Sequence, residues 1–292
     1  MRGLAFRKRL INNIHERSIL MLISDTHLHS FFSSDSEASM EDMVLQGISL
    51  GLRTLCFTEH YDYDFPVTED GLDFQLDFGA YYTMFLRLKE KYASQIELLH
   101  GIELGVQKHA GPALINFYSK IGGRFDFIIN SCHLVDGVDP YDAVFFETHT
   151  PEEGLRRYFE STLDNLKVYP FFQTAGHLDY ISRYIPEPRP EFHYGDYADI
   201  LDEILRYLIH NGKGLEVNTA GLKKGLPWPN PHMEILKRYR ALGGEIITIG
   251  SDAHRPEDMA YDFDRLPEIL SEAGFRYYAL YREQQPEFIP IN

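Results

Sequence analysis

The chain has 292 residues, 44% of them hydrophobic, which is enough for one large α/β barrel or for two ordinary domains with buried cores. Its formal net charge of -16 would repel the phosphates of nucleic acids, so a free DNA- or RNA-binding module is disfavoured. No apolar stretch approaches the length of about 20 residues that crosses a bilayer, and no secretory signal pattern opens the chain, so we expect a cytoplasmic protein without a membrane partner.

Short apolar runs alternate with longer amphipathic stretches, a pattern typical of βα units around a parallel sheet. The apolar runs predict strands near residues 20–25, 53–58, 96–102, 125–131, 171–176, 214–218 and 245–250, with a further one near 277–281. The amphipathic stretches predict helices over 40–52, 78–94, 151–169, 194–212 and 230–244. The first helix has a capping signal, because Ser39 precedes it and Asp42 occupies the capping-box position. Cys56 and Cys132 lie in strand-like runs and are expected to be reduced structural thiols.

The domain organisation follows from the absence of any low-complexity segment, internal repeat or flexible linker in the sequence. One domain over residues 21–292 is the simplest interpretation, preceded by an N-terminal extension at 1–20. Met21 is a candidate for the authentic start of the protein. The prolines of residues 184–195 prevent regular structure, so this segment is a candidate functional loop.

Two histidines stand one residue apart in the stretch "SDTHLHSFFSSDSEAS". In an extended strand, residues i and i+2 point to the same face, so His27 and His29 could close on one ion from the same side. The alternative is a pair of exposed loop histidines without a function. The residues that follow the other predicted strands decide between these interpretations.

Each of the first seven predicted strands delivers potential metal ligands at its carboxyl end. In chain order these are His27, His29 and Asp35, then Glu59 and His60, then Glu103, His133, His177, then Glu216 and Asn218, and finally Asp252 and His254. The carboxyl ends of parallel barrel strands meet at one face, so these side chains should converge. Mixed imidazole and carboxylate ligands suit Zn²⁺, Mn²⁺ or Fe²⁺ better than Mg²⁺ or Ca²⁺. More ligands are present than one ion can use, which indicates two or three ions with a bridging carboxylate.

This constellation resembles the polymerase and histidinol phosphatase (PHP) superfamily over residues 22–256. The resemblance implies a single-domain α/β fold, a distorted (β/α)7 barrel of TIM-like type, with a trinuclear metal site. By position, the first ion would be held by His27, His29, Glu103 and Asp252, the second by Glu103, His133 and His177, and the third by Asp35, His60 and His254. Many relatives carry histidine where this chain has Asp35, and aspartate there resembles the histidinol-phosphatase branch.

Two further segments, "GLEVNTAGLKKGLPWPNP" and "AGHLDYISRY", are also similar to that branch. The resemblance implies that Arg183 and Lys223 contact the substrate phosphate. Relatives commonly carry arginine in place of Lys223, and lysine offers no bidentate fork, so an exposed loop charge is the alternative for this residue. Glu216 and Asn218 would either orient a substrate amine or support the metal ligands by hydrogen bonds.

The function implied by the resemblance is hydrolysis of L-histidinol phosphate, a small phosphorylated substrate of histidine biosynthesis, with catalytic roles for Glu103, Asp252 and His254. One alternative is a PHP-type phosphodiesterase or exonuclease that acts on nucleotides or short oligonucleotides; the net charge disfavours a polymeric substrate. Another is a metal-binding regulatory or structural domain that has lost catalysis, which the full set of ligands disfavours. No oligomeric state is predicted.

Overall fold

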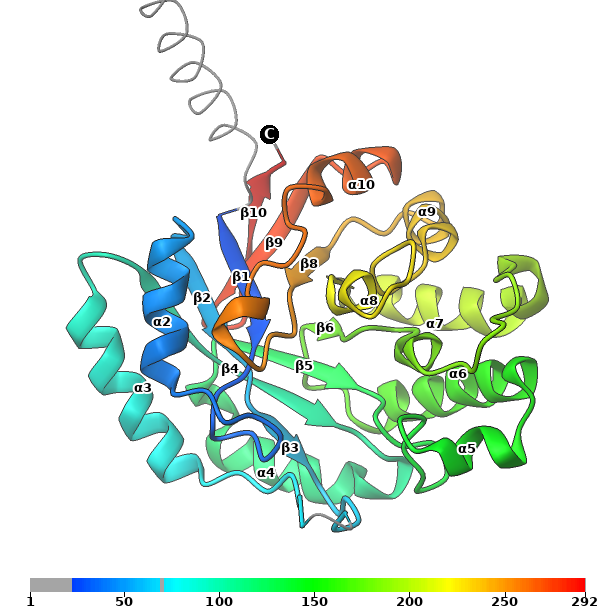
Figure 1. Ribbon diagram of the computed structural model, residues 1–292, viewed down its shortest axis with the longest axis horizontal. Coiled ribbons are helices and arrows are strands. Elements are labelled where there is room, and N and C mark those ends of the chain that lie inside the picture. Colours follow the sequence, from blue (N-terminus) through cyan, green and yellow to red (C-terminus); the bar gives the residue numbers. More distant parts are fainter. Residues whose placement is uncertain (1–22, 69–70, 292) are drawn as a thin grey trace, which may run out of the picture.

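The computed structural model describes residues 23–68 and 71–291, and in this part of the chain parallel strands form a nearly closed barrel surrounded by helices (Figure 1). Seven of the described strands follow one another around it: β1 (Ser24–Leu28), β2 (Thr54–Phe57), β4 (Glu97–Gly105), β5 (Phe127–Ser131), β6 (Thr174–Ala175), β7 (Gly214–Asn218) and β8 (Ile247–Gly250). A short strand, β3 (His60–Asp62), pairs in parallel with the carboxyl half of β4. The expected distorted (β/α)7 barrel is confirmed.

The barrel closes where β1 meets the segment that follows β8. Leu28 and Ala253 form a parallel bridge, and the Asp252 N–H donates a hydrogen bond to the His27 carbonyl at 2.7 Å. The His29 N–H donates to the Ala253 carbonyl at 2.8 Å. The main-chain hydrogen bonds that close the barrel therefore hold together two segments that carry predicted metal ligands.

A buried carboxylate and a glycine reinforce this closure. The Asp25 carboxylate of β1 accepts hydrogen bonds from the Ser251 N–H at 2.9 Å and from the Ser251 hydroxyl at 2.5 Å. Burial raises the pKa of Asp25, although these hydrogen bonds oppose the shift. At Gly250 a Cβ atom would lie 2.2 Å from the Cβ of His27, so only glycine permits this approach of β8 to β1.

Helices cover the outside of the barrel (Figure 1). They are α2 (Met40–Ser49), α3 (Phe78–Tyr92), α4 (Gly111–Ile121), α5 (Ala143–Thr148), α6 (Pro151–Val168), α7 (Ala198–His210), α8 (Ala220–Lys223), α9 (Met233–Ala241) and α10 (Leu266–Glu272). The predicted cap of α2 is confirmed, because the Ser39 hydroxyl accepts a hydrogen bond from the Asp42 N–H at 3.0 Å. On α6, Leu155, Phe159 and Leu163 recur every four residues and are buried, as expected for a helix packed on one face.

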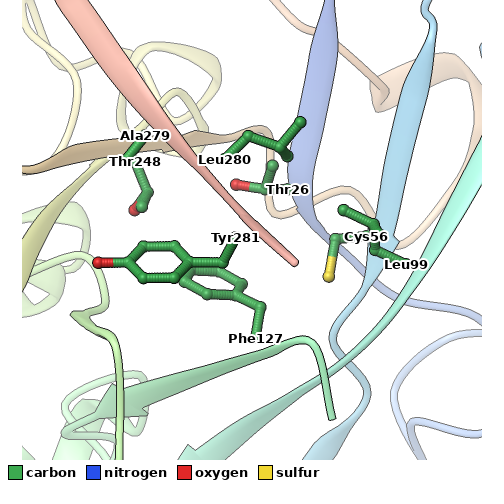
Figure 2. A pocket seen from close by; sticks show the side chains of 8 residues that line it. All are labelled: Thr26, Cys56, Leu99, Phe127, Thr248, Ala279, Leu280 and Tyr281. Atoms are coloured by element: carbon green, nitrogen blue, oxygen red, sulfur yellow. The ribbon is translucent and has the colours of Figure 1, made fainter. Parts of the chain in front are cut away.

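An antiparallel hairpin near the C-terminus packs against the barrel. It consists of β9 (Tyr277–Arg282) and β10 (Gln285–Pro290). Leu280 and Tyr281 of β9 join Cys56 and Phe127 in an apolar cluster, and the ring of Tyr281 stacks on that of Phe127 with centroids 5.3 Å apart (Figure 2). The strand predicted near 277–281 therefore exists, but it pairs with β10 and lies outside the barrel sheet.

The first described strand, Ser24–Leu28, overlaps the predicted 20–25 at its start and continues three residues beyond the predicted end, whereas residues 20–22 lie outside the described part of the chain. Its polar residues are buried because they find partners inside the protein: the Thr26 hydroxyl donates to the Ile249 carbonyl at 2.7 Å. A strand of buried polar residues escapes a search for apolar runs. β3, β10, α4, α5, α8 and α10 were also not predicted.

The proline-rich segment, the two cysteines and the N-terminal extension were also the subject of predictions. Within the predicted loop 184–195, residues 184–193 contain no helix or strand, but a 3₁₀ turn over Tyr194–Tyr197 begins before the end of the predicted segment. Cys56 and Cys132 are both buried and free. Among the described residues, no helix is both long enough and apolar enough to span a membrane. The predicted extension at 1–20 and the candidate start at Met21 lie outside the described residues.

Candidate metal centre

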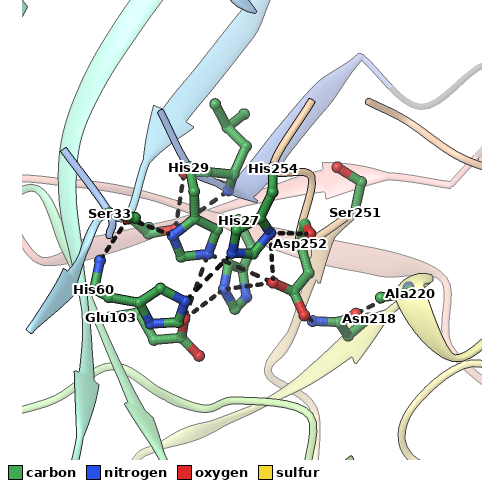
Figure 3. Close-up of polar contacts among 12 residues, drawn as sticks. His27, His29, Ser33, His60, Glu103, Asn218, Ala220, Ser251, Asp252 and His254 are labelled. Carbon is green, nitrogen blue, oxygen red and sulfur yellow. Dashed lines mark hydrogen bonds and ion pairs between the residues drawn. The ribbon is translucent and has the colours of Figure 1, made fainter. Parts of the chain in front are cut away.

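Predicted ligands from β1, β4 and the segment after β8 meet at the carboxyl end of the barrel (Figure 3). The Nε2 atoms of His27 and His29 lie 3.0 and 3.4 Å from Glu103 Oε2. The same two nitrogens lie 3.7 and 3.5 Å from Asp252 Oδ1. All four side chains are buried or nearly so, with exposed fractions of 0% to 8%.

These separations fit a transition metal ion. A tetrahedral ion with ligands at about 2.1 Å holds its ligand atoms about 3.4 Å apart. The Nε2 atom of His29 is also buried without a hydrogen-bond partner, which is costly unless its lone pair binds an ion. Burial and the neighbouring His254 and His60 lower the pKa of His29 well below its usual value. Its ring is therefore neutral, which is the form that ligates metals.

The other oxygen of Glu103 faces a second group of ligands. Glu103 Oε1 lies 3.2 Å from His133 Nε2 and 2.9 Å from His177 Nε2. His60 stands at the edge of this group, with its Nδ1 atom 3.2 Å from Glu103 Oε2. Glu103 thus lies between two sets of imidazoles, which is the arrangement of a carboxylate that bridges two ions.

A third group lies at the mouth of the cluster. His254 Nε2 is 3.0 Å from Asp35 Oδ2 and 3.4 Å from His60 Nε2. The ring of His29 stacks on the rings of His60 and His254, with centroids 4.2 Å apart in each case. Asp35 and His254 are 31% and 25% exposed, so this group is the most open to solvent.

Glu216 lies behind the first group of ligands. Its Oε1 atom is 2.6 Å from His27 Nδ1, and its Oε2 atom accepts hydrogen bonds from the His177 N–H at 2.8 Å and the Asn218 amide at 3.1 Å. Both oxygens are engaged within the protein, and the side chain is 1% exposed. Of the two roles considered for Glu216, the geometry favours support of a metal ligand over contact with a substrate.

Asp62 supports a histidine of the second group, as Glu216 does for the first. The sequence analysis did not identify this residue. Its Oδ2 atom lies 2.5 Å from His133 Nδ1, and the carboxylate is 2% exposed. Asp62 pairs with Gly105 across β3 and β4, and a Cβ atom at Gly105 would lie 2.0 Å from Asp62 Oδ2. The glycine therefore makes room for the carboxylate. The signal in the sequence was the segment "HYD" directly after Glu59. It forms the strand β3, in which His60 and Asp62 are two residues apart and therefore point to the same side.

Glu59 supports the first and third groups without facing them. Its carboxylate accepts hydrogen bonds from the hydroxyls of Ser30 at 2.5 Å and Ser33 at 2.7 Å. The Ser33 hydroxyl lies 3.0 Å from His29 Nδ1 and accepts the His60 N–H. Burial raises the pKa of Glu59 to about 7, although the serine hydrogen bonds oppose the shift.

Arg183 lies beside the first group, at the end of a 3₁₀ turn over Tyr180–Arg183. Its Nη1 atom donates to Asp252 Oδ2 at 2.9 Å, and its Nη2 atom donates to Asn218 Oδ1 at 2.9 Å. Nε donates to Asn230 Oδ1 at 2.7 Å. Arginine has five N–H donors, so two remain after these three bonds. Asn218 itself is buried and orients Arg183.

Lys223, which the sequence also assigned to the substrate, is not drawn into this group. It forms an ion pair with Asp258 and is 39% exposed. Lys223 is thus an exposed charge, as in the alternative interpretation, but it is the last residue of α8 and does not lie in a loop. Burial, followed by repulsion from Arg183, lowers the pKa of the neighbouring Lys224.

Comparison with known proteins adds family evidence to this geometry. Residues 25–220 match the PHP domain family. The chain is 32% identical over 258 residues to a histidinol-phosphatase of Lactococcus lactis subsp. lactis, covering 88% of this chain and 93% of the relative. It is 34% identical over 260 residues to a probable histidinol-phosphatase of Thermotoga maritima, covering 88% and 94%.

Two solved structures of similar fold are also histidinol phosphatases by name. The chain superposes with a TM-score of 0.81 and 30% identity on the crystal structure of the Lactococcus lactis histidinol phosphate phosphatase complexed with zinc, L-histidinol and phosphate, over 90% of this chain and 98% of the other. A putative histidinol phosphatase of Listeria monocytogenes shares the fold, with a TM-score of 0.72 at 21% identity and coverage of 82% and 98%.

The position of Glu103 between two groups of imidazoles leads to a testable expectation about metal content. Glu103→Gln removes the negative charge that faces both groups, so the purified variant should bind fewer ions per chain than the unchanged protein, as measured by inductively coupled plasma mass spectrometry. Glu59→Gln is the matched control, because it neutralises a carboxylate equally buried but turned toward serine hydroxyls. Equal metal loss in the two variants would contradict the bridging role.

Proposed function

This chain belongs to the PHP domain family, and on that premise we propose that it is a metal-dependent phosphomonoesterase that hydrolyses L-histidinol phosphate to L-histidinol and phosphate. The observation that carries the proposal is the convergence of histidines and carboxylates around Glu103, with ligand spacing that suits transition metal ions. Relatives that align over most of the chain bear this activity in their names, and one was solved with zinc, L-histidinol and phosphate.

The residues would hold two or three ions in the groups described above. Such ions, when bound, stabilise the charge of a phosphoryl group as Lewis acids and activate water near neutral pH. His27, His29 and Asp252 would hold an ion on one side of Glu103, and His133 and His177 would hold another on the opposite side. Carboxylates behind the histidines fix the ring orientations, so the site is preorganised before a substrate arrives.

Arg183 is the residue of this chain best suited to hold the substrate phosphate. Its guanidinium is fixed in place by Asp252, Asn218 and Asn230, which leaves two N–H donors next to the ligand cluster. Charge-assisted bonds from these donors to phosphate oxygens would position the ester and neutralise its charge. Lys223 could contact the phosphate only if its ion pair with Asp258 opened, so we assign it a smaller role in phosphate binding than Arg183.

The alternative of a nucleotide phosphodiesterase or exonuclease has less support. It shares the metal chemistry, but the aligned relatives are named as phosphatases of histidinol phosphate or as a probable phosphatase. The net charge of -16 also opposes a polymeric nucleic acid substrate. The cytoplasmic location inferred from the sequence stays a prediction.

Substrate turnover tests the proposed function directly. The purified protein should release phosphate from L-histidinol phosphate much faster than from a generic aryl phosphate, and it should leave a dinucleotide essentially uncleaved. Removal of bound metal with a chelator should abolish the activity, and added Zn²⁺ or Mn²⁺ should restore it, because the ligand cluster requires ions to act. Faster cleavage of the dinucleotide would favour the diesterase alternative, and full activity after verified metal removal would exclude the mechanism.

The phosphate-binding role of Arg183 can be measured separately. Arg183→Ala should lower kcat/KM for L-histidinol phosphate about 10- to 100-fold, because charge-assisted hydrogen bonds to a phosphate are lost. Arg183→Lys keeps the charge and should retain more activity. Arg156→Ala, which removes a partly exposed arginine paired with Asp199, is the control and should behave like the unchanged protein. If Arg183→Ala leaves turnover intact, the phosphate lies elsewhere.

A further inference from the structure

The side chain of Asp179 does not play the part that its position in the chain would suggest. Asp179 immediately precedes the 3₁₀ turn that ends at Arg183, and aspartate at the start of a helical turn commonly caps it by accepting a main-chain N–H. The Asp179 carboxylate makes no such cap. It is buried, with an exposed fraction of 3%, and accepts hydrogen bonds from the segment just before α9 instead.

Both carboxylate oxygens of Asp179 are occupied by donors from that segment. Oδ1 accepts a hydrogen bond from the Asn230 side-chain amide at 2.6 Å, and Oδ2 accepts one from the His232 N–H at 2.8 Å. Because an ionised carboxylate accepts and cannot donate, the NH₂ group of Asn230 has to face Asp179. The oxygen of the same amide then faces Arg183, whose Nε–H it accepts at 2.7 Å. Asp179 thus determines which end of the amide meets the guanidinium.

Asn230 has little freedom to adapt in another way. Its N–H donates to the Asn218 carbonyl at 2.9 Å, and the Asn218 N–H donates back to the Asn230 carbonyl at 2.7 Å. The Asn230 side chain is fully buried, and a Cβ atom at Gly221 would lie 2.8 Å from its Oδ1 atom. The glycine therefore leaves only the space that the amide fills. A change at Asp179 should act on Asn230 by exchanging the positions of the amide oxygen and nitrogen.

We propose that Asp179 is a positioning residue for phosphate binding, which sets the direction of the Arg183 guanidinium through the Asn230 amide. This inference rests on the proposed function, in which Arg183 holds the phosphate, and deepens it by naming a residue that acts on the arginine through another side chain. Among the described residues, Asp179 and Arg183 share no hydrogen bond or ion pair. The guanidinium is planar, so an acceptor fixed at Nε also fixes where its two remaining N–H donors point.

An exchange of the two side chains tests these contacts. In Asp179→Asn, the new amide has one oxygen for two donors, so Asn230 has to flip or lose a bond. The variant's kcat/KM for L-histidinol phosphate should fall about 3- to 10-fold. The Kd of inorganic phosphate for the metal-loaded protein, measured by isothermal titration calorimetry, should rise by a similar factor.

Asn230→Asp alone brings two carboxylates together and should be at least as harmful as Asp179→Asn. The combined variant, Asp179→Asn with Asn230→Asp, restores the order of donors and acceptors. Its new amide can accept the His232 N–H and donate to the new carboxylate, which accepts the Arg183 Nε–H. Both kcat/KM and the phosphate Kd should therefore return to within about twofold of the values for the unchanged protein.

The effect of Asp179→Asn should also depend on Arg183. In an Arg183→Ala background, the same change should alter kcat/KM by less than about twofold, because no guanidinium remains to be positioned. A purely structural role would cost the same factor in both backgrounds. Asp202→Asn is the matched control, because it neutralises another buried carboxylate, one that accepts a hydrogen bond from Arg238 at 2.7 Å, and its effect should be equal with and without Arg183.

Metal content separates this role from an effect on the neighbouring ligand His177. Asp179→Asn should bind as many ions per chain as the unchanged protein, and a loss of metal would overturn the proposal. An equal fall with and without Arg183, or a combined variant no better than Asp179→Asn, would overturn it as well. If Asp179→Asn does not fold, recovery in the combined variant decides. Failure of the unchanged protein to hydrolyse L-histidinol phosphate would instead overturn the proposed function, and the phosphate Kd would still test Asp179.

Discussion

The buried carboxylate of Glu103 is the interaction on which the rest of the site depends. Imidazole nitrogens of five histidines, His27, His29, His60, His133 and His177, lie within 3.4 Å of its two oxygens. An ionised group with no exposed surface is tolerated only where charges or hydrogen bonds compensate it. Those five histidines come from four different parts of the barrel. The Glu103 carboxylate therefore contacts side chains from most of the carboxyl end of the barrel. Metal ions would complete that compensation.

The segments that close the barrel also carry ligands of the site. The main-chain bonds between His27, His29 and the Asp252–Ala253 segment close the barrel, and the side chains of the same segments form the first ligand group. Supporting groups such as Glu216 and Asp62 then hold the imidazole rings from behind. Ligands held from behind in this way favour one geometry around the ions.

The sequence predicted the barrel and the residues that converge, because parallel strands alternate with helices and because ligand-type side chains recur at strand ends. The pattern of residues alone could not separate ligands from the carboxylates that support them, because Glu59, Asp62 and Glu216 are the same residue types at similar positions. The family resemblance left Glu59 and Glu216 out of the ion groups, but it gave no role to Asp62. The apolar pattern ended β1 three residues too early, because the later residues of this strand include polar side chains that are buried. The position of Lys223 at Asp258 depends on a tertiary contact that no local pattern indicates.

We propose that several metal ions share Glu103 in the working protein. Anomalous X-ray diffraction from crystals of the purified protein can be collected at the zinc, manganese and iron absorption edges. If the ions share this carboxylate, the maps should contain at least two anomalous peaks within coordinating distance of it, one toward His27 and Asp252 and another toward His133 and His177. A single peak that does not contact Glu103, or no peak within the cluster, would contradict it.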